Sequence, residues 1–173
     1  MGQCCFGGRR RSVKLFAALI SLLAGALPGL AVAAGDCAPD RLDIRGDWGT
    51  ARFHIELADD AQERAQGLMF REQISTGQGM LFLYQTAHRP AFWMKNTLIA
   101  LDMLFITPEG RVQHIHENAT PGDLTPINGG DGVLAVFEIK GGLARSMGLE
   151  AGSEVRFPGF EQSIALWPCS SGN

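Results

Sequence analysis

The feature that most limits the fold of this 173-residue chain is a series of short apolar segments separated by turn residues. In the first segment Phe53, Ile55 and Leu57 alternate with polar side chains, which is the pattern of a strand with one buried face. The other strand candidates are residues 80–84, 91–94, 98–107, 111–117, 132–140 and 152–157. Segments of this length and spacing predict a mainly β (α+β) fold, either a compact small barrel or a rolled antiparallel sheet of about seven short strands.

Two short helices are expected among these strands. Asp60 followed by Glu63 has the sequence of a capping box, which begins a helix that Gly67 can end. A second helix of one or two turns is expected within residues 141–148. The sequence Pro108-Glu109-Gly110 predicts a tight turn, because proline presets φ and glycine permits a positive φ. The two segments that flank this turn are therefore expected to form an antiparallel hairpin.

The first 34 residues have the composition of a secretory leader. Residues 9–14 form a basic head, residues 15–30 form an apolar run, and Ala31-Val32-Ala33 supplies the small residues that precede a cleavage site. A membrane anchor is the alternative, but Pro28-Gly29 interrupts the run near its end. We expect a cleavable signal peptide over residues 1–34, with general and twin-arginine export both open. The mature protein would be periplasmic or secreted and would contact a membrane only through the uncleaved leader.

Composition and charge describe the remainder of the chain. Pro39, Gly46 and Gly49 suggest an irregular lead-in over residues 35–50, followed by one β-rich domain over residues 51–169 and a tail over 170–173. After residue 34 the chain has 11 basic and 18 acidic side chains, a formal net charge of −7. An acidic chain gains no free energy from neutralising phosphates, so we expect no nucleic-acid partner.

The cysteines of the mature chain predict one disulfide. Cys4 and Cys5 lie in the leader, which leaves Cys37 near the start and Cys169 near the end. An exported protein with one cysteine at each end is a good candidate for a bridge between them. The alternative is two unpaired thiols on terminal segments.

Two histidines are the main candidates for metal binding. His114 and His116 are two residues apart on a predicted strand, so their side chains should point to the same face. A zinc site needs three or four protein ligands, and no further ligand can be placed beside this pair. We therefore expect no metal and no cofactor, although the sequence leaves metal binding by these two residues open.

Two carboxylates interrupt apolar runs. Asp102 and Glu138 lie in the segments 98–107 and 132–140, where a buried charge is costly unless it is paired or has a function. Arg64, Arg71 and Lys95 could pair with Asp102, and the planar guanidinium group of arginine suits a carboxylate best. We predict an ion pair between Asp102 and Arg64, with Arg71 as the other choice and Lys95 free to face a ligand.

A dense polar and aromatic cluster suggests a binding site. Trp93 is followed by Lys95, Asn96 and Thr97, which places a flat apolar surface beside a cation, an amide and a hydroxyl group. Ligand sites often combine such groups. The alternative is a buried tryptophan followed by an ordinary turn.

Several motifs in this order resemble the domain-of-unknown-function 192 family. They are residues 63–71, 79–82, 92–99, 101–102 and 105–106, of which Phe92-Trp93-Met94-Lys95-Asn96-Thr97 is the most distinctive. The resemblance implies a small, mainly β domain, often exported, and it brings no established activity. The recurrent positions of the family map onto Arg64, Gly67, Met69, Arg71, Gly79, Met80, Trp93, Lys95, Asn96, Thr97 and Asp102. Ala100 departs from the pattern, because the family usually has proline there.

These observations favour a non-enzymatic binding module of the cell envelope. Its partner would be a small molecule or an envelope component, held in a pocket near residues 93–97. The predicted ligand-binding residues are Arg71, Trp93, Lys95, Asn96, Thr97 and Asp102. One alternative is a hydrolase that uses Asp102 or Glu138 as its general acid or base. A second alternative is a structural or accessory protein in which an internal partner occupies every one of these polar groups.

Overall fold

The computed structural model describes residues 1–2 and 37–169, and residues 37–169 lie in one compact unit. The predicted leader and the tail over residues 170–173 lie outside the described residues, apart from Met1 and Gly2. The elements in chain order are β1 (Arg41–Gly46), β2 (Gly49–Ala58), α1 (Ala61–Gln66), β3 (Gln78–His88), β4 (Ala91–Phe92), β5 (Leu101–Ile106), β6 (Val112–Ala119), β7 (Ile127–Asn128), β8 (Val133–Lys140), α2 (Leu143–Met147) and β9 (Glu154–Arg156). None of the described helices has the length and hydropathy needed to cross a bilayer.

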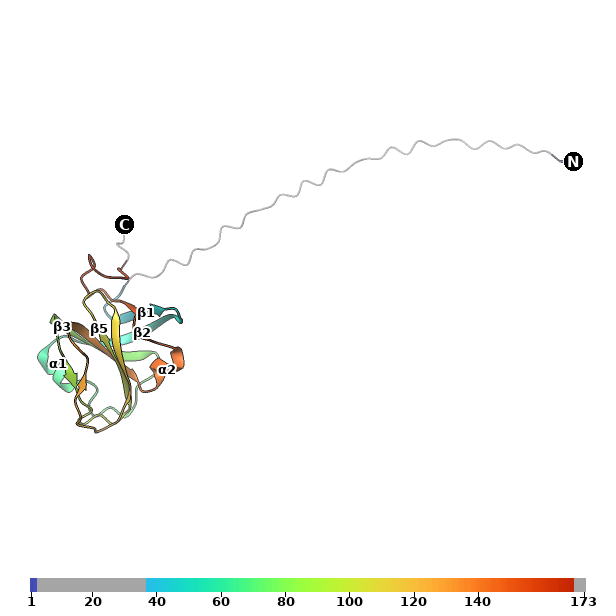
Figure 1. Cartoon of the computed structure of the whole chain (residues 1–173). Helices are drawn as coiled ribbons and strands as arrows, with labels where there is room; N and C mark the ends of the chain where they lie inside the picture. The colour runs from blue at the N-terminus through green and yellow to red at the C-terminus, as the bar shows by residue number, and fades with distance from the viewer. Residues whose placement is uncertain (3–36, 170–173) are drawn as a thin grey trace. The chain divides into compact units, whose positions relative to one another are not determined.

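Seven strands form one curled sheet in the order β6-β5-β8-β3-β2-β1-β9 (Figure 1). Its two edges meet, because Arg111 bridges Glu154, and the Val112 amide donates to the Ser153 carbonyl at 2.8 Å. The prediction of a mainly β, rolled sheet with two short helices is confirmed. One pairing differs from the expected antiparallel arrangement: β2 and β3 are parallel. The segment that contains α1 joins these two strands and supplies the crossover that parallel neighbours need.

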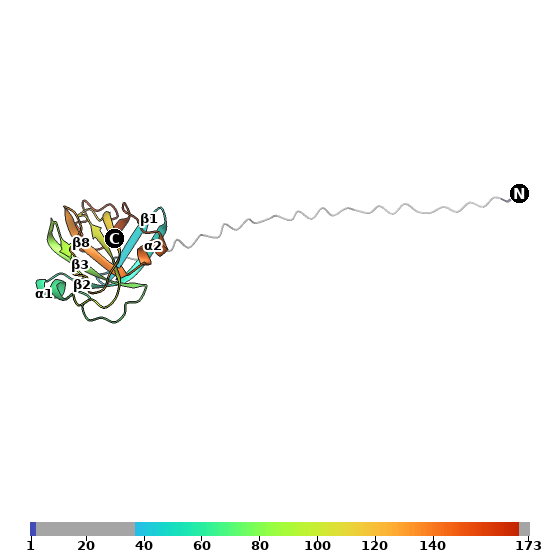
Figure 2. The same cartoon turned by 60° about the horizontal axis from the view of Figure 1, so that its bottom comes forward.

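Apolar side chains cover both faces of the curled sheet. On β8, Phe137 and Ile139 pack into the core on the inner side of the curl, whereas Val136 packs into a second core on the outer side. Because side chains alternate along a strand, Glu138 shares the outer face with Val136. Helices α1 and α2 lie at opposite sides of the domain in both views (Figure 1, Figure 2).

The capping box at the start of α1 is confirmed. The Glu63 amide donates to Asp60 Oδ1 at 2.8 Å, and the Asp60 amide donates to Glu63 Oε2 at 3.4 Å. Gly67 ends the helix with φ of 50°, and its amide donates to the Glu63 carbonyl at 2.8 Å. The helix expected within residues 141–148 is α2, and its final cap is Gly148 in the left-handed conformation.

The expectation of an irregular lead-in over residues 35–50 is wrong for residues 41–46, which form β1. Leu42 and Ile44 of this strand are fully buried, and they alternate with the buried carboxylate Asp43. Asp43 accepts hydrogen bonds from Arg52 Nε at 2.7 Å and from Arg156 Nη2 at 2.5 Å. These two arginines stabilise the charge inside the sheet, so a polar stretch of sequence can form a strand.

The predicted disulfide is confirmed: Cys37 and Cys169 are bonded, with their Cα atoms 5.7 Å apart. The segment before Cys169 is also fixed by its ring contacts. The guanidinium groups of Arg45 and Arg156 lie 4.5 Å and 4.4 Å from the ring centre of Trp167. Both ends of the described domain are therefore attached at the edge formed by β1 and β9.

The hairpin prediction is confirmed by the antiparallel pairing of β5 with β6. Gly110 in its turn has φ of +80°, and a Cβ atom added there would lie 2.6 Å from the Val155 carbonyl oxygen. We expect Gly110→Val to lower the free energy of unfolding by about 2 kcal/mol or more, because a β-branched residue resists positive φ and meets backbone. Urea unfolding should show this loss. Gly77→Ala is the control, since a Cβ atom at Gly77 meets nothing within 4 Å; equal stability of the two variants would contradict the prediction.

Candidate ligand-binding site

The segment 93–97 is attached to the chain that follows α1. The Phe70 amide donates to the Asn96 carbonyl at 2.8 Å, and Asn96 Nδ2 approaches Met69 Sδ at 3.9 Å. Phe70 and Asn96 both have positive φ values, of 63° and 55°. Left-handed backbone in such residues is uncommon, and it is found more often at functional sites than elsewhere.

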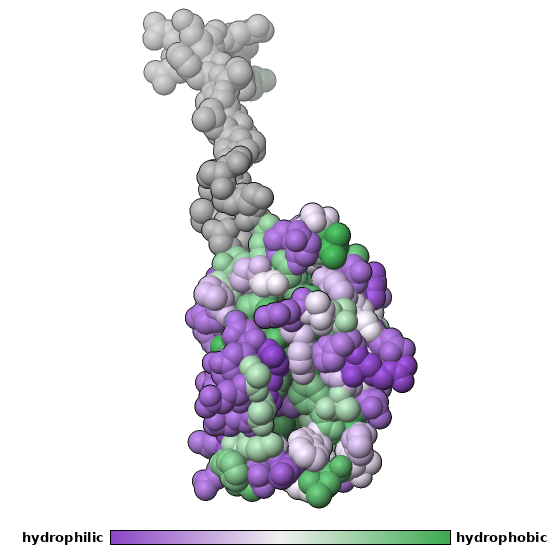
Figure 3. All heavy atoms as spheres, turned by 90° about the vertical axis from the view of Figure 1, so that its left-hand side faces the viewer, coloured by the Kyte–Doolittle hydropathy of each residue, from purple (hydrophilic) through white to green (hydrophobic). Residues whose placement is uncertain are grey.

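Trp93 and Thr97 of this segment line a pocket of about 240 Å³ that lies against α1 and β3. We call it the Glu138 pocket. Its aromatic lining residues are Phe82, Tyr84, Phe92 and Trp93, its main polar ones are Arg64, Thr97 and Glu138, and its aliphatic ones include Leu68 and Met69. Figure 3 looks onto the side of the domain that carries α1 and shows hydrophobic atoms in a recess between hydrophilic areas.

Glu138 is the unusual residue of this pocket. It is 4% exposed and pairs in register with Met80 of β3 and Met103 of β5, so it lies in the middle of the sheet. Among the described residues no hydrogen bond or ion pair reaches its carboxyl group. Burial raises the pKa of Glu138 from 4.5 to about 8. The carboxyl group is therefore mostly protonated at neutral pH, and it can either donate a hydrogen bond or give up its proton to a ligand.

Arg64 lines the same pocket from α1. Its Nη1 atom donates to the Leu83 carbonyl at 3.0 Å and also to the Asp59 carbonyl, and the guanidinium group lies 5.0 Å from the ring centre of Tyr84. Burial raises the pKa of Tyr84, so its hydroxyl group stays protonated. These contacts hold the Arg64 charge beside the aromatic lining of the pocket.

The polar and aromatic side chains of the segment 93–97 differ in how they relate to the pocket. Trp93 is 50% exposed, and Lys95 Nζ lies 5.2 Å from its ring centre. Thr97 is buried, and its hydroxyl group donates to the Lys95 carbonyl at 3.3 Å. Lys95 and Asn96 are exposed and do not line the pocket. Of the six predicted ligand-binding residues, the structure thus places two, Trp93 and Thr97, in the pocket lining.

The predicted ion pair between Asp102 and Arg64 is wrong. Asp102 is fully buried, and its carboxylate accepts hydrogen bonds from the amides of Asn118 at 2.6 Å, Gly142 at 2.8 Å and Ala144 at 2.7 Å. Backbone donors can stabilise a buried carboxylate as well as a cation can. Asp102 therefore fixes the end of β6 and the start of α2.

Asp102 and Arg71 also lie outside the pocket lining. Asp102 pairs in register with Ile139, the neighbour of Glu138, so the two acidic side chains point to opposite faces of the sheet. Arg71 binds the Glu56 carboxylate through both terminal nitrogens, at 2.6 Å and 2.5 Å. The hydrogen bonds to Glu56 raise the pKa of Arg71. Because Glu56 binds Arg71, the alternative prediction of an ion pair between Arg71 and Asp102 is also wrong.

Because three backbone amides donate to Asp102, we expect the protein to lose stability when the charge of this side chain is removed. Asp102→Asn would replace one acceptor oxygen by an NH2 group that faces a backbone N–H in a buried site. We expect a loss of about 3 kcal/mol in the free energy of unfolding at neutral pH. Urea unfolding measures it, with Asp47→Asn at an exposed position as the matched control. A change below about 0.5 kcal/mol, as at an ordinary surface site, would show that the charge of the Asp102 carboxylate does not contribute to its hydrogen bonds with the three amides.

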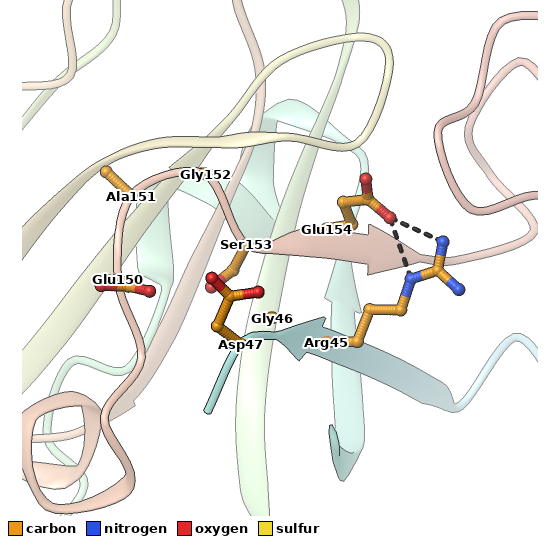
Figure 4. A pocket seen from close by; sticks show the side chains of 8 residues that line it. All are labelled: Arg45, Gly46, Asp47, Glu150, Ala151, Gly152, Ser153 and Glu154. Atoms are coloured by element: carbon orange, nitrogen blue, oxygen red, sulfur yellow. Dashed lines mark hydrogen bonds and ion pairs between the residues drawn. The ribbon is translucent and has the colours of Figure 1, made fainter. Parts of the chain in front are cut away.

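A second pocket, of about 400 Å³, is a weaker candidate (Figure 4). It lies between the end of β1 and the loop before β9. Arg45 is bound to Glu154 at 2.7 Å, and the Ser153 hydroxyl group accepts a hydrogen bond from Trp48 Nε1 at 3.0 Å. The remaining carboxylates of this pocket, Asp47 and Glu150, are exposed. Internal partners thus already occupy its buried polar groups.

Metal ligands do not gather in the part of the chain that the structure describes. Within residues 37–169 no group of three His, Cys, Asp or Glu side chains is placed to hold a metal ion. His114 stacks on Phe105 with 5.7 Å between ring centres, and His116 lines another pocket together with Met94 and Ile127.

The fold and the pocket together describe a small domain with a curled β-sheet and a buried, unpaired carboxyl group on the outer face of that sheet. The model of the DUF192 family, described as "Uncharacterized ACR", matches residues 43–157 of the chain. The chain therefore belongs to the DUF192 family, as the sequence motifs predicted. Among curated proteins no match to the chain is found.

Two solved structures are similar to the chain. A protein of unknown function from Novosphingobium aromaticivorans DSM 12444 is 41% identical, with a TM-score of 0.65, and the match covers 66% of this chain and 82% of the other. A protein from Sinorhizobium meliloti 1021, provisionally described as a transcription regulator, is 36% identical with a TM-score of 0.66. That match covers 70% of this chain and 95% of the other.

Proposed function

We propose that the protein is an exported domain of the cell envelope that binds a small ligand, or one side chain of a partner, in the Glu138 pocket. The observation that carries the proposal is the buried carboxyl group of Glu138, which has no partner among the described residues and lines the pocket. Such a group is costly unless something binds it. The pocket is smaller than typical ligand sites, which favours a small ligand or a single side chain.

The alternatives account less well for the arrangement of the acidic side chains. A hydrolase needs a second group that can exchange a proton with Glu138 near neutral pH, but Asp102 points to the opposite face, and burial raises the pKa of Tyr84, the other titratable acid of the pocket lining. A purely structural role requires every polar group to have an internal partner. Asp102 and Arg71 meet this condition, whereas Glu138 does not.

The leader sequence and the disulfide support the proposal that the protein is exported. The acidic net charge argues against binding to nucleic acid. The basic head and apolar run of the leader precede a chain with a Cys37–Cys169 bond, which is typical of oxidising compartments. Residues 35–173 have a formal net charge of −7, so the description of the Sinorhizobium protein is not extended to this chain.

Export can be tested on protein purified from the producing bacterium. We expect intact-mass analysis to find a mature chain that begins at Ala34 or Gly35, because peptidase cleaves after the small residues of Ala31-Val32-Ala33. An intact N-terminus on membrane-held protein would contradict the predicted leader.

Binding in the Glu138 pocket can be tested by amide NMR with a small-fragment library. Bound fragments should shift the amides of residues 64–69 and 91–97. Ala65→Trp should abolish these shifts, because Ala65 is an exposed residue of the pocket lining and a large side chain would fill the opening. Ala61→Trp on the same helix lies outside the lining and is the matched control. Hits that map elsewhere, or that survive Ala65→Trp, would contradict the proposed site.

A further inference from the structure

The two ends of the Glu138 pocket differ in their chemistry. Met80 and Tyr84 are four residues apart on the same face of β3, so their Cα atoms are separated by about 13 Å along the strand. Glu138 is paired with Met80, whereas the guanidinium group of Arg64 lies over Tyr84. The pocket therefore has an acidic group toward one end of this stretch and a cationic group toward the other.

Apolar side chains occupy the space between these ends. Phe82, midway between Met80 and Tyr84, packs edge-to-face on Phe92 with 5.1 Å between ring centres. Leu68 and Met69 complete this part of the lining. A short hydrocarbon chain would lie against these residues without leaving a polar group of its own unpaired.

Both terminal groups have free bonding capacity. Glu138 has no partner among the described residues, and Arg64 uses only Nη1 for its two carbonyl acceptors. Within the described chain, Nε and Nη2 of Arg64 have no acceptor. A carboxylate could therefore bind Arg64 through these nitrogens while an ammonium group binds Glu138.

We propose that the Glu138 pocket takes a small zwitterionic ligand, with an ammonium group at Glu138, a carboxylate at Arg64 and a short apolar chain between them. This inference rests on the binding function proposed above. It also fixes the orientation, since the reverse placement would set two like charges against each other at each end. A ligand with only one charged end would leave either the Glu138 carboxyl group or the Nε and Nη2 groups of Arg64 without a partner.

Binding of an ammonium group requires the carboxylate form of Glu138, so the proton of the acid passes to solvent. The other charged or titratable groups on this face of the sheet come from every neighbouring element: Arg64 from α1, Glu56 of β2 with its partner Arg71, Tyr84 and His88 from β3, His114 and His116 from β6, and Lys140 two residues further along β8. The strand neighbours in register with Glu138, Met80 and Met103, are uncharged. Proton release on binding is expected to come from Glu138, because no histidine lines the pocket, and Glu138→Gln separates its contribution from that of the histidines.

Isothermal titration calorimetry with three probes tests the proposal on the purified protein. We expect 6-aminohexanoate to bind at least about tenfold more tightly than hexanoate or hexylamine, because only the first probe satisfies both ends. Glu138→Gln and Arg64→Gln should each reduce its affinity about tenfold or more. Arg89→Gln removes an exposed arginine that is paired with Asp131, outside the pocket, and should leave the affinity unchanged. At pH 7 the binding enthalpy should vary with the ionisation enthalpy of the buffer, and Glu138→Gln should abolish this variation.

Two results would overturn the inference that the ligand is zwitterionic. If hexanoate or hexylamine binds wild-type protein as tightly as 6-aminohexanoate, the pocket binds ligands but the inferred ligand class is wrong. If none of the three probes binds at millimolar concentration, the inferred class is also wrong, and the fragment experiment with Ala65→Trp then decides separately whether the pocket binds anything. The comparison among probes uses wild-type protein, so it does not depend on the folding of any variant.

Discussion

Glu138→Gln is expected to make the protein more stable than the wild type at pH 9, by on the order of 4 kcal/mol, and to change its stability little at pH 4. Burial raises the pKa of Glu138 in the folded protein to about 8, whereas its ordinary value is 4.5. Between these values the unfolded chain gives up the proton and the folded chain keeps it. The stability of the wild type should therefore fall as pH rises from 4.5 to 8 and then level off. Glutamine carries no charge at any pH, so the variant should lack this loss.

Urea unfolding of both proteins from pH 4 to pH 9 measures the effect. The difference between their free energies of unfolding should grow steadily across the window and become constant above pH 8. Glu72→Gln, at an exposed position, is the matched control and should retain the pH dependence of the wild type. Parallel curves for wild type and Glu138→Gln over the whole range would show that the Glu138 carboxyl group is solvated.

Removal of the disulfide is expected to lower the free energy of unfolding by about 5 kcal/mol. The bond joins residues 132 positions apart, and the chain-entropy model assigns this size to a loop of that length because the cross-link restricts the unfolded chain. A double variant, Cys37→Ala with Cys169→Ala, should show the loss in urea unfolding. Both side chains are only half-buried, so little packing is lost with them.

A thiol titration tests the same bond directly. Denatured, oxidised protein purified from the exporting cell should contain no reactive thiol at Cys37 or Cys169. Two reactive thiols in freshly exported material, or a loss of stability below about 1 kcal/mol in the double variant, would contradict the prediction.

The elements that the sequence could predict are those with local signals. The alternation of Phe53, Ile55 and Leu57, the pair of Asp60 and Glu63, and the glycine at position 110 each act within a few residues. β1 could not be predicted because the charge of Asp43 is balanced by Arg156, 113 residues away. Polar residues alone suggested a loop, whereas their distant partners make a strand.

The candidate site shows the same limit more strongly. Asp102 could be identified from the sequence as a buried acid, but its three backbone donors come from β6 and the start of α2. Nearly every residue has a backbone amide, so no residue type in the sequence indicates which amides bind the carboxylate. Trp93 and Thr97 could be predicted because they lie in one motif. Arg64 and Glu138 come from α1 and β8, and only the order of strands in the sheet brings them to one pocket.

The position of the Cys37–Cys169 bond also determines how the domain would respond to mechanical load. A pulling force applied to the chain before Cys37 and after Cys169 would pass through the covalent bridge, because these two residues enclose all the described strands and helices. The hydrogen bonds of the curled sheet would then carry none of the tension. Under a pulling force the oxidised domain would extend very little, whereas in the reduced domain the first and last strands, β1 and its neighbour β9, would be loaded first.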